Sequence, residues 1–379
     1  MKVAFLIPSF EGGGTERVII TLANGFAKRG IDVFIISLNS KGAYQNEVNE
    51  NVKIEILNTK RTIFSFIKIK NFLDKENPNI LFSSIAHLNI FIIIVKRIMV
   101  KSDRKFVIRE SNTLSEIMKS NNNLKNIILC KLIRIFYPKA DLIVSPSQGV
   151  ADDLMKNYGI DKNKIKVIYN PIDHKFLLNM AKEPVDNYFI NNKSPEKVII
   201  GIGSLTKQKN FSSLIMAFYN IKRHHNYKLI ILGEGKERSK LESLIERLNI
   251  RDCILMPGFV KNPFKYLINA NVFVLSSIYE GLPNVLIQAL LLGVPCVSTK
   301  CKSGPEEILN FGEYGQLVRI NDHVEMSDAI LNVLEGRLKQ KNINGLEKKY
   351  NINKIINNYL ESPVFNKYNL LNKGILDHQ

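Results

Sequence analysis

Residues 2–38 read KVAFLIPSFEGGGTERVIITLANGFAKRGIDVFIISL, and this stretch decides the expected fold. Residues 2–10 are apolar almost throughout, which is typical of a parallel strand that is buried on both faces. A glycine run follows, and residues 15–28 then show a helical pattern that Gly30 ends. Residues 32–38 predict a second strand. Together these segments form a βαβ unit with a glycine-rich turn after its first strand.

The same alternation of strand-like runs and helix-sized intervals continues along the chain. Further strands are expected in the first half at residues 80–84, 105–109 and 142–145. In the second half they are expected at residues 197–203, 228–233, 253–258, 272–276, 295–299 and 315–319. Such alternation is typical of parallel sheets in α/β proteins. The sequence therefore predicts two doubly wound α/β domains, with ligands bound in a cleft at the carboxyl ends of their strands.

The length of 379 residues exceeds what one ordinary hydrophobic core requires, so two domains are expected. The sequence NPID at residues 170–173 and the polar stretch 181–195 resemble a linker. We expect an N-terminal domain over residues 1–172, a linker over 173–196, a C-terminal domain over 197–348, and a helix and tail over 349–379. The last segment is expected to pack back toward the N-terminal domain.

The composition excludes several protein classes. With 45% hydrophobic and 23% charged residues, the chain is typical of a globular protein and not of a disordered one. Its longest apolar run, residues 90–95, is far shorter than the roughly 20 residues of a membrane-spanning helix. The first residues lack the pattern of a signal peptide. Scattered cysteines without a CxxC pair indicate reduced thiols and argue against a zinc site.

The net charge of +18 is concentrated in one region. Residues 51–139 hold 17 Lys or Arg and six Asp or Glu, so about a quarter of the chain carries more than half of the excess. Such a region indicates an anionic partner, which is a phospholipid surface, nucleic acid or a phosphorylated substrate. A genome composition that favours lysine codons is the alternative, although it explains the clustering less well.

Two segments of the basic region, residues 88–101 and 124–137, combine apolar and basic side chains. The basic residues are Lys96, Arg97 and Lys101 in the first segment and Lys125, Lys131 and Arg134 in the second. Helices of this kind can lie on an anionic membrane surface. The alternative is that both segments are core helices whose charges face solvent.

The glycine run does not fit a dinucleotide-binding site. If Gly12 and Gly14 begin a G-x-G-x-x-G motif, its third glycine is replaced by Arg17, whose side chain obstructs helix–strand packing. The second strand also ends without a carboxylate for a ribose hydroxyl. No P-loop, H-E-x-x-H or G-x-S-x-G motif is present. The run is therefore either a turn without a ligand or a loop whose amides face an anion at a helix start.

The stretch with the most specific functional pattern is SSIYEGLPNVLIQAL at residues 276–290. It follows an expected strand, and Pro283 opens a helix at a position where its missing N–H costs nothing. The helix start offers free amides to an anion, and Glu280 lies just before it. Asn284 and Gln288 are four residues apart and share one helix face. This pattern predicts an anion site with a carboxylate beside it, although a lone loop glutamate is also often a solvated surface group.

This stretch resembles the E-x7-E motif of retaining glycosyltransferases of family 4, which have the GT-B fold of two Rossmann-like domains facing across a cleft. Other segments resemble the same family in the same order, and the resemblance spans about residues 1–360. They are GGGTER (12–17, glycine loop), VIRESNTL (107–114, acceptor-side loop), SPSQGVADDL (145–154) and NPID (170–173) at the interdomain approach, GSLTKQKN (203–210, phosphate loop), and SGPEEIL (303–309).

The resemblance implies a role for each matching residue. Glu280 and Lys209 are implied as catalytic, Glu280 on the hydroxyls of the donor sugar and Lys209 on the leaving phosphate. The implied donor-binding residues are Gly13, Gly14, Ser204, Lys207, Lys209, Leu282, Pro283, Asn284 and Gln288. The implied acceptor-binding residues are Thr15, Arg109, Glu110 and Asn112, and an ordinary loop after a strand is the alternative for the last three. Ser204 replaces an Arg that is common in the family, and Gln288 replaces the second Glu of the motif.

The implied reaction is transfer from a nucleotide diphosphate sugar, most often a UDP-sugar, to a lipid-linked or growing polysaccharide acceptor. Groups placed at the leaving phosphate stabilise the transition state more than the ground state. The resemblance implies neither a metal nor another cofactor, and the sequence contains no D-x-D pair. The implied enzyme is cytoplasmic and peripherally associated with the inner face of the membrane.

Two other functions were considered. The first is a GT-B nucleotide-sugar 2-epimerase or hydrolase, which works without a glycan acceptor. The second is nucleic-acid binding, which is disfavoured because the basic region shows no RNP, KH or helix-turn-helix pattern.

Overall fold

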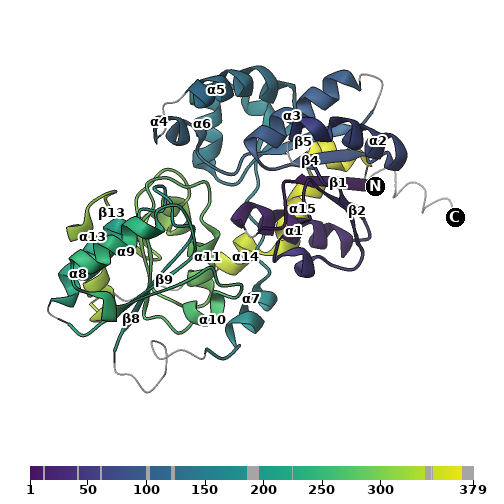
Figure 1. Cartoon of the computed structure of the whole chain (residues 1–379). Helices are drawn as coiled ribbons and strands as arrows, with labels where there is room; N and C mark the ends of the chain where they lie inside the picture. The colour runs from purple at the N-terminus through teal and green to yellow at the C-terminus, as the bar shows by residue number, and fades with distance from the viewer. Residues whose placement is uncertain are drawn as a thin grey trace. The chain divides into compact units, whose positions relative to one another are not determined.

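The computed structural model of the chain consists of two compact units (Figure 1). Unit 1 comprises residues 1–172 and 348–379, and unit 2 comprises residues 173–347. The structure describes residues 1–11, 13–40, 42–59, 62–99, 103–120, 124–185, 196–223, 225–337, 343 and 345–368. Gly12, Lys101, residues 186–195 of the expected linker and the end of the expected tail therefore lie outside the described residues.

Unit 1 is built on a seven-stranded parallel sheet in the order β3-β2-β1-β4-β5-β6-β7. The strands are β1 (Lys2–Ile7), β2 (Asp32–Ser37), β3 (Val52–Ile56), β4 (Ile80–Ser83), β5 (Lys105–Arg109), β6 (Leu142–Ser145) and β7 (Ile165–Val167). The two edge strands were not predicted, because β3 alternates apolar with polar residues and β7 has only three residues. The strand order reverses between β1 and β4, which is the topology of a doubly wound sheet.

Helices cover both faces of this sheet. On one face, α1 (Gly14–Ala27) packs against α15 (Ile352–Leu360), and the ring centroids of Phe26 and Tyr359 lie 5.9 Å apart. The C-terminal helix thus belongs to the core of unit 1 (Figure 1). The other face is covered by α2 (Phe66–Glu76), α3 (Ala86–Ile98), α5 (Leu124–Phe136) and α6 (Gln148–Tyr158), and α4 (Leu114–Ser120) contacts α5 and α6.

Unit 2 contains a six-stranded parallel sheet in the order β10-β9-β8-β11-β12-β13. The strands are β8 (Val198–Ile202), β9 (Lys228–Leu232), β10 (Ile254–Gly258), β11 (Val272–Leu275), β12 (Cys296–Thr299) and β13 (Gln316–Val318). Its helices are α7 (His174–Ala181), α8 (Phe211–Lys222), α9 (Arg238–Arg247), α10 (Phe264–Leu267), α11 (Asn284–Leu291), α12 (Pro305–Ile308) and α13 (His323–Leu334), while α14 (Leu346–Tyr350) crosses the boundary. All six strands predicted for the second half are confirmed, as is the doubly wound α/β class.

The two basic, apolar helices of unit 1 differ sharply in burial. In α3 the apolar run is part of the core, and Lys96 Nζ lies 2.6 Å from Asp141 Oδ2. Most apolar side chains of α3 are therefore buried in the core, although Ile94 and Ile98 are exposed. Contact of residues 88–101 with a membrane stays a prediction. In α5, which the structure describes throughout, Ile133 is buried, but four apolar residues are exposed. These are Leu124, Ile127, Ile128 and Ile135.

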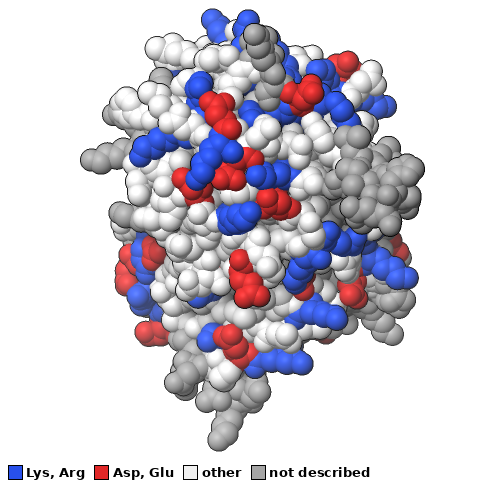
Figure 2. All heavy atoms as spheres, turned by 90° about the vertical axis from the view of Figure 1, so that its right-hand side faces the viewer, with Lys and Arg blue, Asp and Glu red and all other residues white. Residues whose placement is uncertain are grey.

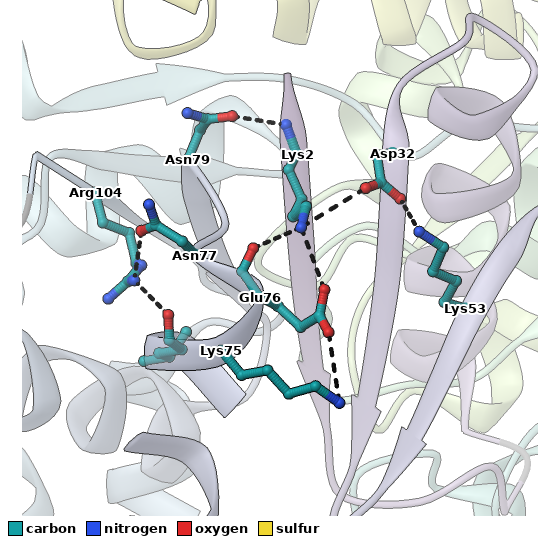
Figure 3. A network of polar contacts seen from close by, with 9 residues as sticks. Lys2, Asp32, Lys53, Lys75, Glu76, Asn77, Asn79 and Arg104 are labelled. Carbon is teal, nitrogen blue, oxygen red and sulfur yellow. Dashed lines mark hydrogen bonds and ion pairs between the residues drawn. The ribbon is translucent and has the colours of Figure 1, made fainter. Parts of the chain in front are cut away.

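Several basic side chains of unit 1 form ion pairs within the unit. On the face that Figure 2 shows, basic side chains are interspersed with acidic ones. At the amino edge of the sheet, Lys2 Nζ lies 3.2 Å from Glu76 Oε2, and Lys53 Nζ lies 3.0 Å from Asp32 Oδ1 (Figure 3). The buried guanidinium of Arg104 donates to the carbonyl oxygens of Pro78 and Leu73. It also donates to Asn77 Oδ1 (Figure 3).

We expect Arg104→Ala to lower the free energy of unfolding by about 2–3 kcal/mol, because it removes the buried hydrogen bonds that the guanidinium donates to the carbonyl oxygens of Pro78 and Leu73. Urea denaturation measures this change. Lys53→Ala is the matched control, since an exposed ion pair contributes less than about 1 kcal/mol. Equal effects of the two substitutions would contradict the assignment of Arg104 as a core hydrogen-bond donor.

Candidate active site

Four loops of unit 2 follow the carboxyl ends of neighbouring strands, which is the edge where doubly wound sheets bind ligands. Residues 203–210 follow β8, and residues 233–237 follow β9. Residues 276–283 follow β11, and residues 300–304 follow β12. Hydrogen bonds join these loops to one another.

The β8 and β9 loops are in direct backbone contact. The Leu205 N–H donates to the Glu234 carbonyl oxygen at 2.8 Å, and the Glu237 N–H donates to the Leu205 carbonyl oxygen at 2.9 Å. Gly233 and Gly235 have φ angles of +145° and +159°, and a Cβ would lie 1.9 Å and 2.3 Å from the nearest backbone carbonyl oxygen. Glycine is therefore required at both positions. Sequence reasoning missed these two residues, although paired glycines directly after a predicted strand were the available signal.

The β8 and β11 loops are joined by three hydrogen bonds. The Ile278 N–H donates to the Gln208 carbonyl oxygen at 2.8 Å, and Gln208 Nε2 donates to the Tyr279 carbonyl oxygen at 2.9 Å. The Ser276 hydroxyl donates to the Lys209 carbonyl oxygen at 2.8 Å. These bonds hold Lys209 beside the loop that carries Glu280.

Lys209 and Glu280, the two residues predicted to be catalytic, form a buried ion pair. Lys209 Nζ lies 2.6 Å from Glu280 Oε1, and the Ser277 hydroxyl donates to the same oxygen at 2.6 Å. Glu280 is 5% exposed. A charge pair this deep is favourable only when its geometry is good and further hydrogen bonds support it, and Ser277 supplies one of them. Sequence reasoning missed Ser277, because a serine in a loop has no distinctive pattern.

The β12 loop supports Glu280 from its other side. The Glu280 N–H donates to the Lys302 carbonyl oxygen at 2.6 Å, and the Ser303 N–H donates to the Glu280 carbonyl oxygen at 3.2 Å. The Thr299 hydroxyl donates to the Ser277 carbonyl oxygen at 2.6 Å. Burial and the nearby Glu280 carboxylate raise the pKa of Cys301 to about 12, so this thiol is neutral at pH 7 and is not a nucleophile. Three loops therefore converge on Glu280.

The remaining residues predicted for the donor lie around this pair. Pro283 is the N-cap of α11 and not its first residue, and both Leu282 and Pro283 are buried. Asn284 and Gln288 are half-buried on α11, and the Gln288 amide has no hydrogen-bond partner among the residues that the structure describes. Two residues of the β8 loop, Ser204 and Lys207, are exposed.

Gly13, Gly14 and Thr15 lie in unit 1, at the start of α1. Both glycines are exposed and Thr15 is half-buried. The Glu16 side chain folds back over Gly13, because a Cβ at Gly13 would lie 2.1 Å from Glu16 Oε2. Burial raises the pKa of Glu16.

The residues predicted for the acceptor follow β5 in unit 1. Arg109 and Glu110 are 2% and 3% exposed, and their side chains are hydrogen-bonded inside the unit. Burial lowers the pKa of Arg109 and raises that of Glu110. These two side chains therefore present almost no surface to an acceptor, whereas Asn112 is half-buried at the loop surface. Sequence reasoning could not show this, since the alternation of a strand does not reveal what covers its end.

The described residues contain no group of three or more His, Cys, Asp or Glu side chains arranged to hold a metal ion. Within the same residues, no helix combines the length and apolar character needed to cross a membrane.

Comparison with known proteins supplies the family. Residues 12–176 match the family described as "Glycosyltransferase Family 4", and residues 186–349 match "Glycosyl transferases group 1". A Campylobacter jejuni protein named "N-acetylgalactosamine-N,N'-diacetylbacillosaminyl-diphospho-undecaprenol 4-alpha-N-acetylgalactosaminyltransferase" is 32% identical, over 88% of this chain and 90% of that protein. The chain belongs to glycosyltransferase family 4.

Two further matches agree with this assignment. Another Campylobacter jejuni protein, named "GalNAc-alpha-(1->4)-GalNAc-alpha-(1->3)-diNAcBac-PP-undecaprenol alpha-1,4-N-acetyl-D-galactosaminyltransferase", is 26% identical to this family 4 glycosyltransferase, over 88% of the chain and 89% of that protein. The crystal structure of Anabaena HepE in complex with UDP and glucose has a TM-score of 0.78 at 21% identity, and covers 95% of this chain and 98% of that one. The expected GT-B fold is confirmed.

The buried ion pair leads to a prediction about stability. Lys209→Ala leaves the Glu280 carboxylate uncompensated, so we expect the free energy of unfolding to fall by about 3 kcal/mol. Adding Glu280→Gln should restore part of this loss, because a neutral amide needs no cation. Urea denaturation of the two single variants and the double variant gives the coupling. Strictly additive effects would show that the two side chains do not interact in solution.

Proposed function

We propose that this family 4 glycosyltransferase transfers a sugar from a UDP-sugar, with retention, to a lipid-linked or growing polysaccharide acceptor in cell-surface glycan synthesis. The observation that carries the proposal is the ion pair of Lys209 and Glu280 at the convergence of three loops. The names of the relatives support the ligand classes. HepE was solved with UDP and glucose, and both Campylobacter jejuni relatives are named for glycans on diphospho-undecaprenol.

The donor is assigned to unit 2. The diphosphate draws the Lys209 ammonium away from Glu280. Further donors are the exposed side chains of Lys207 and Ser204 and the N–H groups of Leu282 and Asn284, since Pro283 has none. Glu280 then accepts hydrogen bonds from hydroxyls of the donor sugar, while Ser277 keeps the carboxylate oriented. On α11, Asn284 lies at the helix start beside the phosphates, and the Gln288 amide binds the ribose hydroxyls.

In the proposed reaction, the bond between the anomeric carbon and the diphosphate oxygen breaks, and the acceptor hydroxyl forms a new bond on the same face. The proton of the acceptor hydroxyl moves to the leaving phosphate oxygen. Negative charge grows on that phosphate, and the preplaced charge of Lys209 stabilises it. We propose that the lysines and backbone amides meet this need without a metal ion.

The acceptor is assigned to unit 1. Thr15 and Asn112 are the proposed contacts of the acceptor, because both are partly exposed. Gly13 and Gly14, at the start of α1, stay proposed donor-binding residues whose amides bind a phosphate. The buried Arg109 and Glu110 hold the loop that carries Asn112.

Incubation with radiolabelled UDP-, GDP- and ADP-sugars tests the function, with and without a polyprenyl-diphosphate-linked N-acetylgalactosamine acceptor. We expect transfer from a UDP-sugar only when the acceptor is present, with unchanged rates in excess EDTA. Lys209→Ala should lower turnover on the order of 10²–10³-fold. The matched control is Lys240→Ala, which removes an exposed lysine of α9.

Three outcomes would contradict this assignment. Release of free sugar or of an epimerised product without an acceptor would support the hydrolase or 2-epimerase alternative. Near-normal turnover of Lys209→Ala would contradict the proposed role of Lys209 at the leaving phosphate. Loss of activity in EDTA would contradict a mechanism without a metal ion.

We also propose that α5 attaches the enzyme to an anionic membrane surface, where a lipid-linked acceptor lies. The helix LKNIILCKLIRIF contains no acidic residue, and its exposed apolar side chains alternate with exposed basic ones. The basic residues are Lys125, Lys131 and Arg134. Each contributes about 1 kcal/mol near an anionic surface, so attachment is reversible.

Binding to vesicles that contain phosphatidylglycerol tests this attachment. Replacing Lys125, Lys131 and Arg134 with Gln should weaken binding by about 10- to 100-fold, and binding should fall as salt rises. The matched control replaces three exposed lysines of unit 2 with Gln, which lowers the net charge by the same amount. These lysines are Lys236, Lys240 and Lys261. Equal binding to neutral phosphatidylcholine vesicles, or equal loss in both triple variants, would contradict the role of α5.

A further inference from the structure

The peptide group that precedes Glu280 is held at both of its ends. Its carbonyl oxygen belongs to Tyr279 and accepts a hydrogen bond from Gln208 Nε2 at 2.9 Å. Its N–H belongs to Glu280 and donates to the Lys302 carbonyl oxygen at 2.6 Å. A peptide group is planar, and in the trans form its C=O and N–H point in opposite directions. The two hydrogen bonds therefore fix the plane from which the Glu280 residue leaves the backbone.

The partners of this peptide come from the strands on either side of β11. The sheet order of unit 2 places β11 between β8 and β12. Gln208 lies in the loop after β8, and Lys302 lies in the loop after β12. Gln208 also binds the β11 loop through its backbone, because its carbonyl oxygen accepts from the Ile278 N–H at 2.8 Å. Gln208 thus holds the two residues that come directly before Glu280.

The β8 loop contacts Glu280 a further time, through the side chain of Lys209. The ion pair between Lys209 Nζ and Glu280 Oε1 joins the same two loops. In the proposed function this link breaks when the donor binds, because the diphosphate draws Lys209 away. The Gln208 amide donates to a backbone carbonyl oxygen, so donor binding leaves its hydrogen bond intact. It continues to hold the peptide at the stage when Glu280 must contact the sugar.

We propose that Gln208 is a positioning residue for the transfer reaction, whose side-chain amide keeps Glu280 aligned with the donor sugar after Lys209 has turned to the diphosphate. This inference rests on the proposed function, which supplies the movement of Lys209. In the ligand-free enzyme the ion pair duplicates the link, so removal of the Gln208 amide has little effect there. Once the ion pair is broken, removal of the amide frees the peptide, and turnover falls more than stability.

Asn271 is a matched control, because it joins the same two strands at their amino ends. The Val198 N–H donates to Asn271 Oδ1 at 2.7 Å, and the Asn271 N–H donates to the Val198 carbonyl oxygen at 2.9 Å. Like Gln208, Asn271 uses one side-chain group and one backbone group. It precedes β11, at the sheet edge opposite the four loops. A purely structural role for Gln208 predicts the same consequences for Gln208→Met and Asn271→Leu.

The kinetic test measures kcat for transfer from a UDP-sugar to the polyprenyl-diphosphate-linked acceptor, alongside urea denaturation. We expect Gln208→Met to lower kcat about tenfold, because a misaligned group loses part of its effect on the transition state. Asn271→Leu should leave kcat unchanged while it lowers the free energy of unfolding at least as much. Equal changes of kcat in the two variants would overturn the positioning role.

Amide hydrogen exchange at residues 278 and 280 tests the inference without an acceptor. Two backgrounds are compared, which are the wild type and the double variant Lys209→Met/Glu280→Gln, in which neither charge of the ion pair remains. We expect Gln208→Met to accelerate exchange less than about threefold in the wild type and about tenfold or more in the double variant. If the double variant does not fold, Glu280→Gln alone supplies the second background.

The exchange results separate the inference from the proposed function. Equal acceleration in both backgrounds, or none in either, would overturn the role of the Gln208 amide. Asn271→Leu should accelerate exchange at Val198 and leave residues 278 and 280 unchanged. If the wild-type enzyme transfers nothing to the acceptor, the proposed function fails, while the exchange result still decides whether Gln208 holds the peptide once the ion pair is gone.

Discussion

Parallel strands are buried on both faces, and this constraint shapes both units of the chain. Most connections return across the sheet as a helix, and because the strands are parallel the loops that follow them all emerge at one edge. In unit 2 this edge collects residues 203–210, 276–283 and 300–304, which are far apart in the sequence. Hydrogen bonds between their backbones place Lys209 against Glu280, and the proposed chemistry depends on that convergence.

Buried charges are stabilised differently in the two units. In unit 2, Lys209 is bound to a carboxylate, and an anionic ligand can replace that carboxylate without leaving the lysine uncompensated. In unit 1, Arg109 is bound by the neutral oxygens of three side chains, which are those of Ser84, Ser111 and Asn170. An arginine bound in this way holds segments of unit 1 together and is not available to a ligand. Lys209 can therefore change its partner when a ligand binds, whereas Arg109 keeps its partners.

The number of basic residues in a segment does not measure the positive surface that the segment offers. Lys2, Lys53 and Lys96 all form ion pairs with carboxylates of unit 1. These charges therefore contribute to contacts within the unit. The basic residues of α5 have no acidic neighbour on their own helix, and exposed isoleucines accompany them. A surface of this kind is favourable at an anionic bilayer and unfavourable in water, and this contrast makes α5 the membrane candidate.

The sequence by itself determined the α/β class, the strands of the second half and the importance of residues 276–290. These features depend on local properties, which are the length of apolar runs and the positions of glycine and proline. Sequence reasoning also identified Lys209 and Glu280, but it predicted that Lys209 contacts the leaving phosphate and Glu280 the sugar hydroxyls. That the two side chains contact each other, and that Ser277 contacts Glu280, is visible only once the loops are folded. The sequence also could not show that Arg109 points inward, because two of its partners, Ser84 and Asn170, come from distant parts of the chain.

The clearest contrast is that between α3 and α5. Their sequences, AHLNIFIIIVKRI and LKNIILCKLIRIF, have the same mixture of apolar and basic residues, and the sequence predicted the same membrane role for both. Only the tertiary structure decided that α3 buries most of its apolar side chains in the core, whereas α5 buries Ile133 and exposes four others. The physical reason is that the burial of a helix depends on what packs against it, and those neighbours come from other parts of the chain.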